Sequence, residues 1–168
     1  ATSIIRSLPL AVSKVGLFVN ASPSFIQEVI AATGLDTVQL HGEETPEFCR
    51  EFRGRVKVWK AFRVRGAETL AKLPAYTEAT DAWLLDAYVA GSSGGTGKTF
   101  EWAHAVAAKE LGRPIILAGG LTPENVAEAV RQVQPFAVDV SSGVEQSPGR
   151  KDPAKLRRFV AAAKGSGP

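Results

Sequence analysis

Two acidic residues at the ends of short apolar runs have the type and setting of acid–base groups. Asp86 ends the apolar run 82–85, and Asp139 lies inside the apolar sequence AVDV. Apolar surroundings favour the protonated form of a carboxyl group, so Asp86 is a candidate general acid. The alternative for Asp86 is a helix cap or an ion-paired acid at a strand end. Asp139 shares a face with Ser141, and we expect its charge to be buried, hence paired or functional.

Gln39 and His41 alternate with apolar residues in the sequence VQLHGEE. Side chains two residues apart in a strand point to the same face, so these two polar groups are expected to lie together. In a barrel that face is the interior or its mouth. A purely structural role for the histidine is the alternative. The spacing of His, Cys and Asp fits no metal-ligand pattern, so we expect no metal.

Two glycine- and serine-rich turns near the end of the chain could bind a phosphate. Gly119-Gly120 and Ser141-Ser142-Gly143 each follow an apolar run. Helix starts are predicted after them, at Thr122-Pro123 and Asp152-Pro153. Turns of this kind aim backbone N–H groups and a helix N-terminus at an anion. Each turn alone could be a plain tight connection, but the pair favours binding of a phosphorylated compound.

The loop GSSGGTGKT at 91–99 invites comparison with a nucleotide-binding P-loop. That motif needs glycine five residues before Gly97, and Ser92 stands there. A flexible lid over an active site fits the loop better. The only cysteine, Cys49, lies on a predicted helix between phenylalanines and is interpreted as a packing residue.

Short apolar runs and helical patterns alternate along the chain. Strands are predicted at 15–20, 37–41, 56–62, 82–86, 114–118 and 137–141. Helices are predicted at 22–33, from 45 through 52, and at 66–73, 99–111, 122–133 and 152–163, and the first residues resemble the end of a further helix. We expect 25, 26, 29 and 30 to share the apolar face of the first of these, and 102, 105 and 106 to face inward. Strict alternation predicts one domain with a parallel sheet covered by helices. An open doubly wound sheet and a closed eight-stranded barrel both remain possible.

Composition is that of an ordinary globular domain. The chain has 168 residues, 45% apolar and 22% charged, with a net charge of +3. Basic residues are scattered and form no nucleic-acid platform. No apolar run approaches the roughly 20 residues that a membrane helix needs. One cysteine excludes an internal disulfide and fits a reducing cytoplasm, where we expect the protein.

In order along the chain, the segments VGLFVN, VQLHGEE, VWKAFRV, LLDA, GGTGKTFEW, ILAGGLTPENV and PFAVDVSSGVEQSPGRKD resemble the phosphoribosylanthranilate isomerases of tryptophan biosynthesis. The resemblance covers about 9–164. It implies a (β/α)8 barrel and an Amadori rearrangement of a phosphorylated anthranilate, with no cofactor and with a monomer or homodimer as the working form.

The resemblance also assigns roles. Asp86 matches the general acid that ends strand six of the family. Gln39, His41 and Asp139 match positions at the substrate. Gly119, Gly120, Ser141, Ser142 and Gly143 match the phosphate-binding turns.

One departure is large. The family's general-base cysteine, in a K-x-C-G context on strand one, has no counterpart here, and Cys49 matches a helix position instead. The family's substrate-binding arginine after strand two is also absent. We expect that the first strand, first helix and second strand are missing, on the order of 40 residues. We therefore expect residues 1–168 alone to bind phosphate weakly and to turn over poorly or not at all.

Other functions stay open at this point. They are a different phosphate-binding barrel enzyme, such as an indole-glycerol-phosphate synthase or a histidine-pathway isomerase, a P-loop module, and a non-catalytic remnant that binds phosphate only.

Overall fold

A computed structural model of the chain describes residues 2–86 and 98–165. Its centre is a parallel sheet of six strands in the order β1-β2-β3-β4-β5-β6. The strands are β1 (Val15–Phe18), β2 (Thr37–Leu40), β3 (Lys57–Arg63), β4 (Ala82–Asp86), β5 (Ile115–Ala118) and β6 (Ala137–Val138). All six predicted strands are confirmed, although β6 is shorter than expected.

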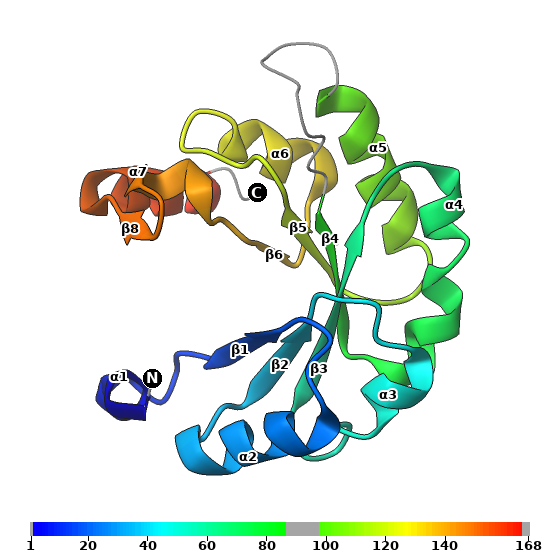
Figure 1. Cartoon of the computed structure of the whole chain (residues 1–168). Helices are drawn as coiled ribbons and strands as arrows, with labels where there is room; N and C mark the ends of the chain where they lie inside the picture. The colour runs from blue at the N-terminus through cyan, green and yellow to red at the C-terminus, as the bar shows by residue number, and fades with distance from the viewer. Residues whose placement is uncertain (1, 87–97, 166–168) are drawn as a thin grey trace.

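The strand order decides between the two architectures. A doubly wound sheet reverses its order at a switch point, whereas here each strand pairs in parallel with the next in sequence. Figure 1 shows the sheet curling around a hollow, with the helices on its outer side and with β1 and β6 at its two edges. This is the arrangement of a (β/α) barrel, with six described strands.

Helices α2, α3 and α7 begin where the capping signals predict. α2 (Pro23–Thr33), α3 (Pro46–Arg50) and α7 (Pro153–Lys164) follow Ser22, Thr45 and Asp152, and each of these side chains accepts a hydrogen bond from the backbone of its first turn. Such caps satisfy N–H groups that the helix itself leaves unpaired. The remaining helices are α1 (Thr2–Ser7), α4 (Ala67–Leu70), the 3₁₀ helix η1 (Leu73–Ala79), α5 (Lys98–Lys109) and α6 (Val126–Val133).

The predicted helix start at Thr122 is wrong, because α6 begins at Val126. Thr122 instead opens a turn, in which its hydroxyl accepts from the Glu124 N–H and its own N–H donates to Asn125 Oδ1 at 2.8 Å. Asn125 Nδ2 also donates to the Gly120 carbonyl. Local side-chain hydrogen bonds of this kind compete with the hydrogen bonds of a helix, so the helix begins later in the chain.

The segment after β6 also differs from the prediction. The strand expected to reach 141 ends at Val138, and the 3₁₀ helix η2 (Ser142–Val144) and a hairpin of β7 (Glu145–Ser147) and β8 (Arg150–Lys151) follow. Asp139 therefore lies beyond the strand and is exposed. The expectation that its charge is buried is wrong.

The core lies on both sides of the sheet. Two clusters, around Trp83 and around Phe52, fill the space between sheet and helices, and a smaller one around Leu84 lines the concave side. Trp102 and Ala105 face inward as predicted, but Val106 is exposed. Phe25 is also exposed, beside the β1 edge.

Candidate active site

One pocket of about 220 Å³ gathers every residue that the sequence singled out as a site residue. It lies where β2, β4, β5 and β6 end, at the rim where barrels of this class carry their active sites. Those residues are Gln39, His41, Asp86, Gly119, Gly120, Asp139, Ser141, Ser142 and Gly143. They lie at or after the ends of four strands and are separated by up to about a hundred residues of sequence, so only the fold brings them together.

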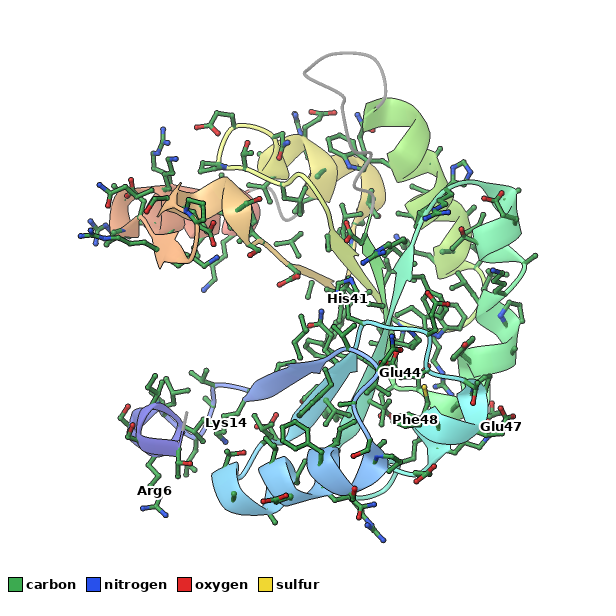
Figure 2. The ribbon with its side chains drawn as sticks, viewed as in Figure 1. Arg6, Lys14, His41, Glu44, Glu47 and Phe48 are labelled. Carbon is green, nitrogen blue, oxygen red and sulfur yellow. The ribbon has the colours of Figure 1, made fainter. Side chains whose placement is uncertain are left out.

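His41 is the central side chain of this pocket. Gln39 Nε2 lies 3.3 Å from His41 Nδ1. Which of the two groups donates in this contact depends on the tautomer of the imidazole ring. His41 Nε2 in turn lies 3.8 Å from Asp86 Oδ2. Figure 2 shows His41 at the centre of the molecule, in the hollow of the curled sheet.

Asp86 keeps the position that the sequence predicts, at the end of β4. Its side chain is 22% exposed and faces His41. The carboxyl group is thus reachable from the pocket while apolar strand residues surround its base. The Asp86 carboxyl group is therefore placed to donate a proton to a molecule bound in the pocket.

Asp139 differs from Asp86 in its surroundings. Loss of hydration raises the pKa of the Asp139 carboxyl, the nearby His41 opposes this, and the Asp86 carboxylate raises the pKa further. Since the side chain is still exposed, solvent screens the effect. The pocket therefore contains two carboxyl groups close enough to affect each other's charge.

The two glycine turns pack directly against each other. Gly119 and Gly120 have φ of 89° and 61°, a left-handed conformation that favours glycine. A Cβ on Gly143 would overlap the Leu121 carbonyl oxygen, so only glycine permits this approach. Gly120, Ser142 and Gly143 all line the pocket on these two turns. Backbone N–H donors that converge at a pocket wall suit an anion.

Lys151 is a neighbour of this site that sequence reasoning missed. Its Nζ donates to the Ser141 carbonyl at 2.9 Å and to Glu145 Oε1 at 2.9 Å. It thereby fixes the second turn and adds a positive charge beside it. The hairpin that carries Lys151 gave no strand signal in the sequence, since β7 and β8 are short and polar.

Cys49 is a packing residue, as predicted. It is fully buried on α3, and burial raises the pKa of its thiol to about 12. The thiolate needed for nucleophilic or base chemistry is therefore not formed near neutrality. The predicted lid at 91–97, and with it most of the P-loop comparison, lies outside the described residues.

Among residues 2–86 and 98–165, no group of three or more His, Cys, Asp or Glu side chains could hold a metal ion. In the same part of the chain, no helix is long and apolar enough to cross a membrane.

The chain matches one known protein family over almost its whole length. The family model described as N-(5'phosphoribosyl)anthranilate (PRA) isomerase matches residues 1–162. The chain belongs to this family. A relative from Citrifermentans bemidjiense named N-(5'-phosphoribosyl)anthranilate isomerase is 61% identical over 164 residues, which cover 98% of this chain and 77% of that protein. One of the same name from Geobacter sulfurreducens is 53% identical, covering 98% and 79%.

Solved structures of the family have the same fold. The phosphoribosylanthranilate isomerase from Thermotoga maritima matches with a TM-score of 0.87 at 43% identity, covering 98% of this chain and 78% of that one. A second isomerase structure, in complex with reduced 1-(o-carboxyphenylamino)-1-deoxyribulose 5-phosphate, matches with a TM-score of 0.85 at 39% identity, covering 98% and 77%. The fold expected from the resemblance, that of the (β/α)8 isomerases, is confirmed.

Proposed function

We propose that this chain performs the isomerisation for which its family is named, the Amadori rearrangement of N-(5'-phosphoribosyl)anthranilate in tryptophan biosynthesis. The product is 1-(2-carboxyphenylamino)-1-deoxyribulose 5-phosphate. The observation that carries the proposal is that Asp86, His41 and both glycine turns line one pocket. Such a pocket suits a phosphorylated sugar whose reacting carbon and phosphate group lie at opposite ends of the molecule.

In this proposal Asp86 is the general acid. It protonates the ribose ring oxygen, the C1–O bond breaks, and the anilino nitrogen supplies the electron pair that forms the C1=N bond. Removal of the C2 proton then gives an enol, which becomes the C2 ketone as C1 regains a proton. No atom is gained or lost, so no cofactor is required. His41, 3.8 Å from Asp86 Oδ2, favours the carboxylate left after the transfer when the imidazole is protonated.

The phosphate of the substrate is assigned to the facing turns at 119–120 and 141–143. The N–H groups of Gly120, Ser142 and Gly143 would donate to its oxygens, and Lys151 would add charge attraction. Gln39 and Asp139 would contact the polar middle of the substrate.

The base that removes the C2 proton is not assigned to any residue of the pocket. The resemblance assigns this step to a cysteine with no counterpart here, and Cys49 is buried away from the pocket. A phosphate-binding protein without turnover is the second candidate function, and the two glycine turns that line the pocket are the observation that favours it.

Further parts of the proposal concern partners and location. The substrate is the expected small-molecule partner, with no nucleic acid and no membrane. A cytoplasmic location is supported by the single unpaired cysteine. The working form is a monomer or homodimer, as we expect from the family resemblance.

The experiment compares two aspartates at opposite ends of β4. Asp86→Asn should lower turnover on the order of 100-fold or more, the usual contribution of a general acid, and should leave binding of the reduced product analogue nearly unchanged. Asp81→Asn is the matched control, since Asp81 binds Arg53 and the Val58 N–H at the far end of the strand. Equal turnover of Asp86→Asn and the parent chain would reject Asp86 as the acid.

The parent chain's own behaviour separates the two candidate functions. Binding of the analogue with measurable turnover supports the isomerase. Binding without turnover supports the non-catalytic protein, and absence of binding contradicts both.

A further inference from the structure

Two charged side chains are almost completely buried beside the pocket, yet neither lines it. The side chains of Lys60 and Glu44 are 3% and 2% exposed, and Lys60 Nζ lies 3.3 Å from Glu44 Oε2. Burying a pair of charges is costly, and such pairs are often no more stabilising than apolar residues of the same size. Stability alone is therefore a weak reason for this pair.

The contacts of Lys60 are directed at the loop after β2. Its Nζ donates to the carbonyl oxygens of Leu40 at 3.2 Å, Gly42 at 2.8 Å and Ala61 at 2.9 Å. Leu40 and Gly42 are the two neighbours of His41 in the chain. Lys60 thus holds the peptide groups on both sides of this histidine.

Lys60 is not itself a ligand group. It borders a second pocket of about 460 Å³, next to the candidate active site. An ammonium has three N–H donors, and three carbonyls and one carboxylate already surround this one. No donor is left for a molecule in that pocket.

Glu44 also binds the loop after β2, and the pair Lys60 and Glu44 is called the clamp below. Its carboxylate accepts from the Gly42 N–H at 2.9 Å and from the Asn20 N–H at 2.9 Å. Asn20 Oδ1 accepts in turn from the Glu43 N–H at 2.7 Å. A Cβ on Gly42 would overlap Asn20, so the loop is packed tightly as well as bonded.

We propose that Lys60 and Glu44 are positioning residues that hold His41 in register with Gln39 and Asp86. The proposal rests on the proposed function, in which His41 acts beside the general acid. Figure 2 shows His41 and Glu44 at the centre of the molecule, on the loop that leaves β2. In the backbone position that this clamp holds, the imidazole lies 3.3 Å from Gln39 Nε2 and 3.8 Å from Asp86 Oδ2.

The test uses a double variant, Lys60→Met with Glu44→Gln, which removes both charges and leaves neither one buried alone. The control is Arg53→Met with Asp81→Asn, which removes an ion pair near the first residues of β3 and β4, away from the loop after β2. Glu44→Gln alone, nearly identical in shape, serves if the double variant does not fold.

The first readout is the imidazole NMR spectrum. The chain has two histidines, so His104 on α5 is an internal reference. The Lys60/Glu44 variant should shift or broaden the His41 ring signals and leave those of His104 in place. The control pair should lower the melting temperature without moving either histidine.

The second readout is affinity for the reduced product analogue, measured by calorimetry. The Lys60/Glu44 variant should bind on the order of tenfold more weakly, as is common when the groups that support a site are lost, and the control should bind as the parent chain does. Unchanged His41 signals and unchanged affinity in a folded variant would overturn the proposal. If the parent chain does not bind the analogue, the proposed function fails, and the NMR readout still decides whether the pair positions His41.

Discussion

Two carboxyl groups share the pocket and differ in what surrounds them. Asp86 ends a buried strand and faces His41, whereas Asp139 follows a strand that stops one residue earlier and faces solvent. The sequence predicted the position of Asp86 at a strand end correctly, but it placed Asp139 inside a strand that ends one residue before it. It could not predict the exposure of Asp139, because that depends on where β6 stops pairing with β5.

Titration of Asp139 should contribute to the pH dependence of the free energy of unfolding. Its pKa is raised from the ordinary value of 3.8, mainly by loss of hydration. The folded chain then holds this proton at pH values where the unfolded chain has released it, so the Asp139 contribution to stability falls as the pH rises from about 3.8 through the raised pKa.

Asp139→Asn removes this contribution. The melting temperature of the variant relative to the parent chain should therefore increase across that pH window and then level off. The measurement is thermal unfolding at a series of pH values. A difference that stays constant with pH, or that decreases, would contradict the assignment.

At the scale of elements, capping signals in the sequence predicted a helix start correctly where one side chain alone determines that start. The caps at Ser22, Thr45 and Asp152 start helices as predicted. Thr122 carries the same signal and fails, because Asn125 bonds back to Thr122 and Gly120 and holds a turn there. That competition depends on three-dimensional geometry that a capping pattern does not contain.

The contact between the two glycine turns is the element-level feature most open to test. Gly143→Ala should push residues 141–143 away from the Leu121 carbonyl and weaken binding of the reduced product analogue on the order of tenfold or more, since a misplacement of about 1 Å costs up to 100-fold in other sites. Calorimetry on the folded variant measures this.

Gly54→Ala is the matched control. Gly54 has φ of 82° in a turn after α3 and has open space around its Cβ position, so the change costs stability through strain without touching the pocket. Equal affinity of the two variants would mean that the turn contact does not shape the binding site.

At the scale of the whole molecule, strand alternation in the sequence predicts a parallel sheet but leaves its closure open. The sequential strand order identifies the barrel arrangement, and the described sheet has edges at β1 and β6. On β1 and just after it, Leu17 and Val19 are each 57% exposed. An apolar sheet edge of this kind is a template for pairing with another chain.

We expect the 168-residue chain to self-associate as its concentration rises. Leu17→Lys places a charge on the β1 edge and should shift sedimentation toward the monomer, whereas a surface change far from that edge, such as Glu47→Lys on α3, should not. If the parent chain sediments as a monomer at every concentration, the β1 edge does not mediate self-association.

The most direct test of the account follows the backbone amides of the chain while the reduced product analogue is added. If the phosphate binds between the two glycine turns, the ¹H–¹⁵N signals of Gly120, Ser142 and Gly143 should show the largest shifts, with the His41 ring signals moving at the same ligand concentrations. Shifts concentrated elsewhere on the molecule, or no saturable shift at these three amides, would contradict the proposed site and with it the proposed function.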